Sequence, residues 1–372
     1  MRTKLKILHV FPSFEIGGAQ RRLVSLINSS DERFQHSVYA MNGCYDALDL
    51  LSGSAVSGHA LPPFPKVSGF AAMRACARLL DEFQPDLLVT CNWGTVEWNL
   101  SGFLGQRCPV IHIQDGFGPD EQAQEKLHRR LTRSLAYRRA DAVVVPSHTL
   151  AAIARKNWGI SETRLNHIPN GIDVARFSGP ADAGLLASLA LGPEHTIIGT
   201  VAALRPEKNV GRLIEAFAHV AETHKQARLV IVGDGIGMRP LKMLTERIGL
   251  YDKVIFTGNL ERPEDILPAF DIFALSSDTE QMPLSVIEAM ACGLPIVATD
   301  VGDVAQMVSR QNAPYVQDTS APNLAKNINA LLDDRATARR LGAANREKAA
   351  REFTLKGMVE RYAALFLQLA GR

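Results

Sequence analysis

The sequence predicts an α/β protein built from two Rossmann-like, doubly wound domains that face a central cleft. Short apolar runs alternate with amphipathic, helix-like runs along most of the chain, which is the pattern of βα units and a parallel sheet. The chain has 372 residues, more than one hydrophobic core usually supports. Because open α/β sheets bind ligands at the carboxyl ends of their strands, the loops after the strands are the predicted functional positions.

The first domain is predicted to extend from residue 1 to residue 172. Its apolar runs predict strands at 5–11, 36–41, 86–91, 109–114, 141–147 and 164–168. The amphipathic segments between them predict helices at 19–28, 69–83, 122–138 and 148–157. The series ends at Pro169-Asn-Gly-Ile-Asp173, where turn-forming residues interrupt the pattern.

A second series predicts a domain from residue 173 to residue 350. Residues 178–195 are rich in Gly, Ala, Pro and Ser without clear periodicity, and they are the predicted linker. Strands are predicted at 196–202, 227–233, 253–258, 271–277 and 295–299, and helices at 323–332, 335–353 and 355–369. The last segment, 351–372, is expected to cross back to the first domain.

The composition excludes several classes of protein. It is that of an ordinary soluble globular chain, with 46% hydrophobic and 22% charged residues. The net charge of +2 indicates no polyanionic partner such as a nucleic acid. The five cysteines include no C-x-x-C pair, which argues against a zinc site or a disulfide framework and favours a reducing compartment. Since no apolar signal region and no 18-residue apolar stretch occur, a cytoplasmic protein is expected.

The most informative stretch is 271–298, where a predicted strand, a polar loop, a helix and another strand follow one another. Pro283 can begin the helix and Gly293 can end it. Glu280 lies in the loop before the helix, and Glu288 lies about one turn further in, roughly 6 to 8 Å along the axis.

The start of this helix predicts an anion site, because first-turn N–H groups and the helix dipole favour negative charge there. A diphosphate bound at this place would bring the groups at its two ends within reach of Glu280 and Glu288. The residues of the loop and the first turn are Gln281, Met282, Pro283, Leu284 and Ser285.

Positive charge for a diphosphate is predicted after the strand at 196–202. Arg205 and Lys208 lie there at the start of a helix-like run, Lys208 as a point charge and Arg205 as a planar fork. Such side chains stabilise leaving-group charge without a metal, and the chain has no Asp-x-Asp triplet to bind one. A solvated basic surface is the simpler interpretation for Arg205 taken alone, but not for Lys208.

Glycines follow several predicted strands, where a missing side chain lets a ligand approach the backbone. Gly17-Gly18 lies between the first strand and its helix, while Gly233-Asp-Gly235 and Gly258 end later strands. Tight turns would explain these glycines equally well. Gly17-Gly18 is not a complete G-x-G-x-x-G fingerprint, which argues against a dinucleotide-dependent dehydrogenase.

Taken in order, five motifs resemble those of retaining glycosyltransferases of the GT-B fold, the GT4 type, and the resemblance covers nearly the whole chain. The motifs are Gly17-Gly18-Ala19, Asn170-Gly-Ile-Asp173, Val232-Gly-Asp-Gly235, Val254-Ile-Phe-Thr-Gly258 and Glu280-x7-Glu288.

The resemblance implies a role for each motif. Glu280 would face the hydroxyls of the donor sugar, Glu288 would face the nucleotide ribose, and Lys208 matches the family lysine. Gly17-Gly18 would form the acceptor-side loop that faces the donor phosphates. The usual arginine of the family would fall at Ala203, two positions before Arg205. Either Arg205 replaces it from another direction, or the phosphate site is weaker than usual.

The stretch 109–121 contains the other candidate residues. In the family that the chain resembles, a histidine at the end of this strand approaches the donor sugar. Here Asp115-Gly116 occupies the place of the family His-Gly, and His112 is the only histidine of the stretch. We favour Asp115 as the side chain near the sugar, and a packed position on the strand for His112.

The segment 126–139 combines basic residues with helical leucine spacing. It has six lysines and arginines and no acid, and Leu127, Leu131 and Leu135 recur every four residues. A basic amphipathic helix of this kind could rest on an anionic membrane and meet a lipid-linked acceptor. The commoner interpretation is a solvated helix face.

These features predict a metal-independent retaining hexosyltransferase that moves a sugar from a nucleotide diphosphate sugar to an acceptor hydroxyl, in the synthesis of a bacterial surface glycan or glycolipid. By the resemblance, the acceptor attacks from the face that the diphosphate leaves, and no cofactor is needed. Both UDP and GDP stay open as donor nucleotides. Two alternatives also stay open: a nucleotide-sugar epimerase of the same architecture, and a catalytically weak nucleotide-sugar-binding partner, which Ala203 and the position of Asp115 would favour.

Overall fold

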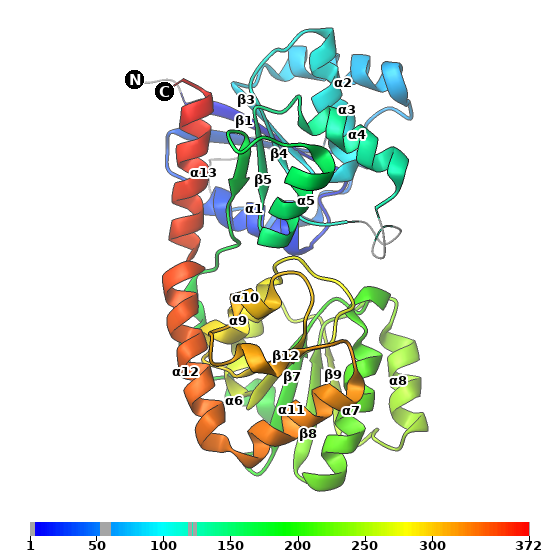
Figure 1. Ribbon diagram of the computed structural model, residues 1–372, viewed down its shortest axis with the longest axis vertical. Helices are drawn as coiled ribbons and strands as arrows, with labels where there is room; N and C mark the ends of the chain where they lie inside the picture. Colours follow the sequence, from blue (N-terminus) through cyan, green and yellow to red (C-terminus); the bar gives the residue numbers. More distant parts are fainter. Residues whose placement is uncertain (1–3, 53–60, 118–120, 122–124, 372) are drawn as a thin grey trace. The chain divides into compact units, whose positions relative to one another are not determined.

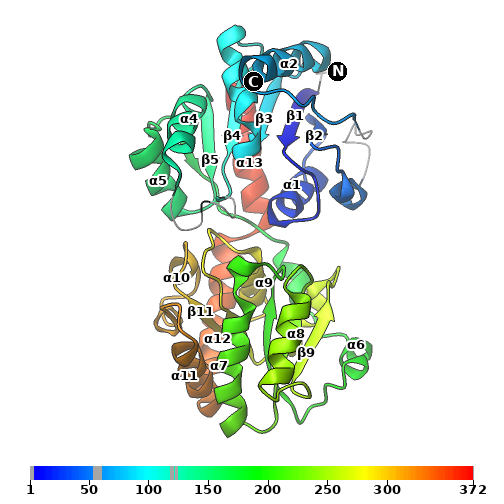
Figure 2. The ribbon, with the colours of Figure 1, turned by 90° about the vertical axis from the view of Figure 1, so that its right-hand side faces the viewer.

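The computed structural model describes residues 4–52, 61–117, 121 and 125–371. The chain forms two compact units: unit 1 is Met1–Asn170 with Leu355–Arg372, and unit 2 is Gly171–Thr354. Each unit contains one parallel sheet of six strands with helices packed on it (Figures 1 and 2). The predicted pair of Rossmann-like sheets is therefore confirmed.

The sheet of unit 1 has the strand order β2-β1-β3-β4-β5-β6. Its strands are β1 (Leu5–Phe11), β2 (Phe34–Ala40), β3 (Leu87–Cys91), β4 (Val110–Ile113), β5 (Ala142–Val145) and β6 (Leu165–His167). Successive strands are added toward one edge of the sheet from β1 to β2 and toward the other edge from β3 onward. The order therefore reverses between β1 and β3, which is where doubly wound sheets leave room for a ligand.

Two hydrophobic clusters cover the two faces of this sheet, because successive residues of a strand point to opposite sides. Leu5 and Ile7 pack on one side, where α1 (Gly18–Asn28) and α13 (Leu355–Leu369) lie, and Leu8 and Val10 pack on the other. The second side is covered by α2 (Gly69–Phe83), α3 (Val96–Leu100), α4 (Leu127–Tyr137) and α5 (His148–Trp158). The helix predicted at 122–138 begins in residues outside the described ones, and the short α3 was not predicted.

The sheet of unit 2 has the order β12-β11-β10-β7-β8-β9, so its direction reverses between β7 and β10. Its strands are β7 (Thr196–Val201), β8 (Ala227–Val232), β9 (Val254–Gly258), β10 (Ile272–Leu275), β11 (Ile296–Thr299) and β12 (Val316–Gln317). The edge strand β12 was not predicted, because two residues are too few to show an alternating pattern.

The helices of unit 2 include one that lies where a linker was predicted. They are α6 (Ala183–Ser188), α7 (Val210–Thr223), α8 (Met238–Arg247), α9 (Leu284–Ala291), α10 (Val304–Met307), α11 (Ala321–Asp333) and α12 (Arg335–Glu352). The predicted linker at 178–195 is wrong, since it contains α6, and Leu185, Leu186 and Leu189 pack against the core of this unit. A helix of six residues shows too little periodicity to be recognised in the sequence.

The chain leaves unit 2 after Thr354, beside the place where it entered at Gly171. The N–H of Ile172 donates to the carbonyl of Phe353 at 2.9 Å, and α13 then contributes Met358, Tyr362 and Phe366 to the core of unit 1. No helix in the described part of the chain is both long and apolar enough to span a bilayer.

Candidate functional site

Lys208 and Glu280 meet at the point where the strand order of unit 2 reverses. Because β7 and β10 are neighbours in the sheet, the loops that follow them leave the same edge side by side. Lys208 ends the short 3-10 turn Pro206–Lys208 after β7, and its Nζ lies 2.6 Å from Oε1 of Glu280. The side chains are 23% and 9% exposed. The structure thus brings together two predicted site residues that are 72 positions apart.

The loop after β10 is anchored to the start of α7 by contacts that the sequence did not reveal. Arg212 donates through Nη1 to the carbonyl of Ser276 at 2.8 Å and through Nη2 to Asp278 at 2.6 Å. Asn209 donates to both carboxylate oxygens of Asp278 at 3.1 and 3.2 Å. These contacts fix the loop relative to Lys208. No local sequence signal would pair residues so far apart, and only the strand order indicates them.

Glu280 is held from two further directions. The hydroxyl of Ser277 donates to Oε1 of Glu280 at 2.8 Å, and the backbone of Glu280 and Gln281 packs closely on Gly302. A Cβ added to Gly302, whose φ is +58°, would lie 2.4 Å from the carbonyl oxygen of Glu280. The N–H of Asp303 donates to the carbonyl of Gln281 at 3.0 Å. The loop before α9 is therefore supported by the loop after β11 as well.

Helix α9 begins at Leu284, with Pro283 at the N-cap position rather than inside the helix. Pro283 and Met282 are buried, whereas Leu284, Ser285 and the loop residue Gln281 are partly exposed. The N–H groups of Leu284 and Ser285 belong to the first turn, which has no acceptor within its own helix. Glu288 lies in the second turn and is partly exposed. The helix start therefore lies where the sequence predicted it, and the anion site there stays a prediction.

Arg205 does not join the pair formed by Lys208 and Glu280. Its side chain is exposed, as is Ala203, and among the described residues it has no ion-pair partner. The backbone of Arg205 caps the turn, where its carbonyl accepts from the N–H of Lys208 at 3.0 Å. Its role as a replacement for an arginine at 203 stays a prediction.

The glycines after β8 have a packing role in the structure. A Cβ on Gly233, whose φ is +135°, would lie 1.9 Å from the carbonyl oxygen of Ala202, and one on Gly235 would lie 2.7 Å from that of Leu204. The loops after β7 and β8 therefore touch backbone to backbone. Gly258 ends β9 with φ +74°, and its carbonyl accepts from Gly233 at 2.8 Å. This packing is sufficient to explain Gly233, and its predicted binding role stays a prediction.

Gly17 and Gly18 lie at the start of α1, beside the reversal point of the sheet in unit 1. Neither has a positive φ. A Cβ on Gly18 would meet nothing within 4 Å, and one on Gly17 would meet only the flexible end of Gln20. A tight turn therefore does not require these glycines, and the open space favours the predicted approach of a ligand to the backbone.

Asp115 follows β4 and forms an ion pair with Arg22 of α1, which the sequence did not indicate. Nη1 of Arg22 donates to Oδ1 of Asp115, and Nη2 donates to Oδ2 at 3.0 Å. Nη1 also lies 3.4 Å from Oδ1 of Asn170. Burial opposes the charge of Arg22, but Asp115 raises the pKa of this guanidinium above its ordinary value. Asp115 thus lies in the predicted loop with its charge compensated.

His112 is buried in the sheet of unit 1, as expected for a packed histidine. Its Nδ1 lies 2.9 Å from the hydroxyl of Thr90 and its Nε2 lies 3.3 Å from Oε1 of Gln114. The ring stacks on Tyr137 with centroids 3.9 Å apart, and Tyr137 donates to Gln114 at 2.6 Å. Burial lowers the pKa of His112 to about 3, so it is a neutral member of a buried network.

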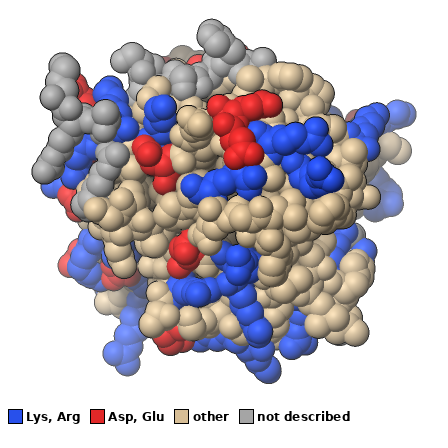
Figure 3. Space-filling model, turned by 90° about the horizontal axis from the view of Figure 1, so that it is seen from above, with Lys and Arg blue, Asp and Glu red and all other residues tan. Residues whose placement is uncertain are grey.

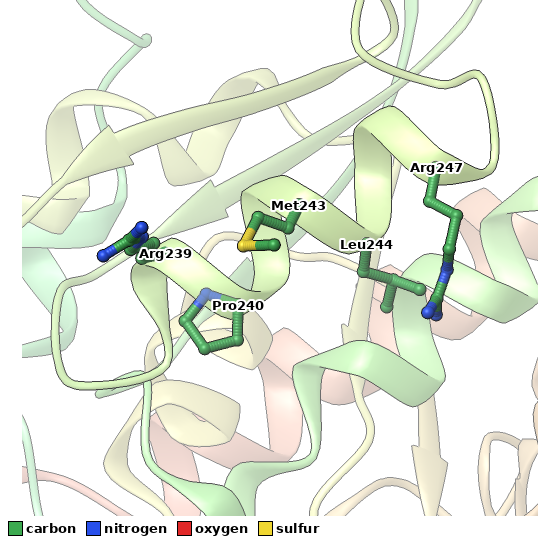
Figure 4. Close-up of a pocket in the computed structure, with 5 residues that line it drawn as sticks. All are labelled: Arg239, Pro240, Met243, Leu244 and Arg247. Carbon is green, nitrogen blue, oxygen red and sulfur yellow. The ribbon is translucent and has the colours of Figure 1, made fainter.

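A shallow hollow of about 480 Å³ lies on α8 (Figure 4). It is lined by Arg239, Pro240, Met243, Leu244 and Arg247, which project from this one helix. None of the predicted site residues lines it. We therefore place the candidate site at the Lys208–Glu280 pair and not at this hollow.

Two family models together match most of the chain. Residues 16–176 match the model described as Glycosyltransferase Family 4, and residues 186–348 match the model described as Glycosyl transferases group 1. The first match begins close to Gly17-Gly18, and the second contains Lys208, Glu280 and Glu288.

Individual relatives share about a quarter to a third of the aligned residues with this chain. D-inositol 3-phosphate glycosyltransferase from Segniliparus rotundus is 26% identical over 289 residues, which are 73% of this chain and 64% of that protein. A GDP-mannose-dependent monoacylated alpha-(1-6)-phosphatidylinositol monomannoside mannosyltransferase from Corynebacterium glutamicum is 30% identical over 213 residues, 54% of this chain and 55% of that protein. The chain spans less than two thirds of the length of both relatives.

The fold is shared with solved structures. The crystal structure of Anabaena HepE in complex with UDP and glucose has a TM-score of 0.78 to this chain and 20% sequence identity, and the alignment covers 97% of this chain and 99% of HepE. The two parallel six-stranded sheets are thus those of the GT-B fold.

Proposed function

Because the chain belongs to the family 4 glycosyltransferases, we propose that it transfers a hexose from a nucleotide diphosphate sugar to an acceptor hydroxyl, with retention at the anomeric carbon and without a metal ion. The observation that carries this proposal is the contact between Lys208 and Glu280 at the strand reversal of unit 2. The contact brings a cation and a carboxylate to the edge of the sheet where nucleotides bind in such folds, which supports assigning Glu280 to the donor sugar.

In the proposed mechanism, the diphosphate binds at the start of α9 and exchanges partners with the ion pair. The Nζ of Lys208 turns from Glu280 to a phosphate oxygen, while Glu280 accepts hydrogen bonds from donor-sugar hydroxyls. Lys208 and the first-turn N–H groups of Leu284 and Ser285 then stabilise the charge that grows on the diphosphate as the glycosidic bond breaks. Glu288 binds the nucleotide ribose from the second turn of the same helix.

Unit 1 supplies the acceptor side in this proposal. The open backbone at Gly17 and Gly18 lets the acceptor approach closely. Asp115 uses the lone pairs that Arg22 leaves available to accept a hydroxyl hydrogen bond. Since Arg22 compensates its charge, Asp115 orients a hydroxyl rather than stabilising an oxocarbenium ion. The departing phosphate oxygen takes the acceptor proton.

Relatives and neighbours support a range of substrates. HepE was crystallised with UDP-glucose, whereas the Corynebacterium glutamicum relative uses GDP-mannose and an acylated phosphatidylinositol mannoside. The Segniliparus rotundus relative acts on D-inositol 3-phosphate. We propose a glycan or a lipid-linked glycan as the acceptor, and a bacterial surface glycan or glycolipid as the product.

A screen of nucleotides and nucleotide sugars tests the proposal. Thermal unfolding in the presence of UDP, GDP and their hexose derivatives should show stabilisation by at least one series, and this should persist with EDTA. Failure of every nucleotide diphosphate to raise the Tm would overturn the proposal.

A second test is analysis of the product. When an acceptor is supplied, NMR of the product should show the same anomeric configuration as in the donor sugar. An isomerised nucleotide sugar formed without acceptor would indicate an epimerase, and binding without turnover would indicate a binding partner.

A further inference from the structure

Helix α4 is oriented opposite to the usual helix of a globular protein. Leu127, Leu131 and Leu135 are 69%, 63% and 53% exposed, whereas Arg133 on the inner face is fully buried. Helices in water normally turn the apolar stripe toward the core and the charges outward. Figures 1 and 2 show α4 on the outside of unit 1. The leucine stripe is therefore a surface that the described residues of unit 1 leave exposed.

A buried ion-pair network fixes this orientation. Arg133 donates to both carboxylate oxygens of Glu121 at 2.6 and 3.0 Å and to Glu125 at 2.8 Å, and its guanidinium lies 4.8 Å from the ring centroid of Trp93. Arg129 adds a contact of 3.0 Å to Glu121. Although burial opposes the charge of Glu121, hydrogen bonds from these arginines lower its pKa to about 2. Turning the leucines inward would leave these buried charges without partners, which costs several kcal/mol.

The network also determines the charge that surrounds the stripe. Glu121 and Glu125 are compensated by Arg129 and Arg133, and α4 itself contains no acid. The remaining arginines along α4 contact backbone oxygens or an aromatic ring and have no carboxylate partner in the described part of the chain; they are Arg130, Arg138 and Arg139. The leucines are therefore bordered by uncompensated positive charge.

The apolar surface continues beyond α4. Phe103, in the 3-10 turn Ser101–Leu104, is 52% exposed, and the guanidinium of Arg139 lies 4.6 Å from its ring centroid. We name the surface formed by Leu127, Leu131, Leu135 and Phe103, with Arg130, Arg138 and Arg139, the α4 surface. On the face shown in Figure 3, basic side chains form separate groups with acidic ones among them.

We propose that the α4 surface docks on an anionic lipid bilayer, with α4 lying in the plane of the interface. The leucines and Phe103 would enter the boundary between headgroups and acyl chains, and the arginines would contact lipid phosphates. A second copy of the chain is a poorer occupant. A two-fold contact through this surface would bring the uncompensated arginines of both copies into one interface. This proposal does not depend on the donor site. Docking on a bilayer would bring the protein to a lipid-linked acceptor.

Sedimentation with vesicles tests the proposal. The full chain should bind vesicles that contain phosphatidylglycerol and bind much less to vesicles of phosphatidylcholine alone, and high salt should weaken the binding. The variant L127Q/L131Q/L135Q should lose at least about tenfold in the partition coefficient, because it removes most of the inserted apolar area. R130E/R138E should lose a similar amount on anionic vesicles, since each arginine near the surface contributes a roughly fivefold effect.

A control and two further measurements keep the outcomes distinct. Met243→Gln removes an exposed apolar side chain, 60% exposed and also beside arginines, from the hollow on α8, and it should bind vesicles like the unchanged protein. Equal binding by the triple leucine variant, or no preference for anionic vesicles, would overturn the proposal. So would a concentration-dependent dimer in sedimentation velocity that the same leucine variant abolishes. Stabilisation by nucleotide diphosphates should be unchanged in these variants, so failure here is separable from failure of the proposed donor site.

Discussion

Lys208 and Glu280 compensate each other's charge across 2.6 Å, and this has different consequences for binding and for transfer. A ligand that carries negative charge must compete with Glu280 for Lys208. A sugar hydroxyl, by contrast, needs Glu280 itself. The two residues can therefore be separated by substitution, although they touch.

Glu280→Gln should bind the free nucleoside diphosphate at least as tightly as the unchanged protein, because Lys208 loses its competing partner. Its kcat should nevertheless fall by about 10²-fold or more, since the carboxylate that orients the sugar is gone. Lys208→Met should lose both diphosphate affinity and about 10²–10³-fold in kcat/KM. Calorimetric titration and steady-state kinetics measure these quantities.

Lys225→Met, in the exposed loop after α7, is the matched control. It should change neither the affinity for the diphosphate nor kcat/KM. Weaker binding of the diphosphate to Glu280→Gln would contradict the proposed exchange of partners.

The Arg22–Asp115 pair predicts that Asp115 affects stability as well as activity. Asp115→Asn would leave the guanidinium of Arg22, only 5% exposed, without a carboxylate, which typically costs about 3–5 kcal/mol. The double variant Arg22→Met/Asp115→Asn should recover part of this loss. Urea unfolding measures both. If the double variant is stable but inactive, a direct role for Asp115 gains support; if it keeps full activity, the carboxylate is only structural.

Among the helices, α9 and α12 approach each other so closely that a side chain has no room between them. A Cβ on Gly342 of α12 would lie 2.0 Å from the carbonyl oxygen of Gly293, which is the second residue after α9 and has φ +78°. The oxygen belongs to the backbone, and the backbone of α12 fixes the position of the Cβ, so no side-chain rotation can relieve the contact. The position of α9, which carries Glu288, thus depends on a glycine far along the chain.

Gly342→Ala should therefore destabilise unit 2 by roughly 1–3 kcal/mol, despite the better helix propensity of alanine. It should also raise the KM for the donor, because α9 is displaced. Gly211→Ala in α7 is the matched control: its Cβ would meet only side-chain atoms at 3.6 Å or more, so it should be neutral or stabilising by up to about 1 kcal/mol. Thermal or urea unfolding of both variants measures their free energies of unfolding. Equal stability of the two variants would refute the packing argument.

At the scale of the molecule, the two units differ in their buried histidines. Unit 1 contains His9, His36 and His112, all fully buried, with Nε2 of His9 2.9 Å from Nδ1 of His36. Burial lowers the pKa of His36 to about 4 and, with the neighbouring His36, lowers that of His9 well below its ordinary value. The histidines of unit 2, His195, His219 and His224, are partly or fully exposed.

Unit 1 should consequently be the acid-sensitive half of the molecule. Its folded state keeps these histidines neutral, while the unfolded chain protonates them below about pH 6.5. The unfolded state therefore binds more protons, and the stability of unit 1 falls as pH drops from about 6.5 toward 4, by up to about 1.4 kcal/mol per pH unit for each histidine.

Urea unfolding between pH 7 and 4.5 should show one transition that moves strongly with pH and another that moves little, and this range lies mostly above that of the carboxylates. The variant His9→Leu/His36→Leu should flatten the pH dependence of the first transition. An unchanged slope in this variant would contradict the assignment.

The sequence predicted most strands because long apolar runs between turn residues are local signals. It missed α3, α6 and β12, which are too short to show a period. It placed Glu280 and Lys208 after strands, as the structure has them, and it placed Gly17-Gly18 between β1 and α1, where Gly18 is the first residue of the helix. It could not pair Arg22 with Asp115, because that pair depends on which loops become neighbours in space.

What the sequence by itself determined is therefore most of the longer elements, the pair of parallel sheets and the loops that carry the candidate site, since propensity and periodicity act between residues close along the chain. Tertiary structure alone decided the partners. The order of β7 and β10 brought Lys208 to Glu280, and the burial of Arg133 turned the leucines of α4 outward. A helical period defines a stripe, but which stripe faces the core depends on the charges and rings that a folded neighbour presents.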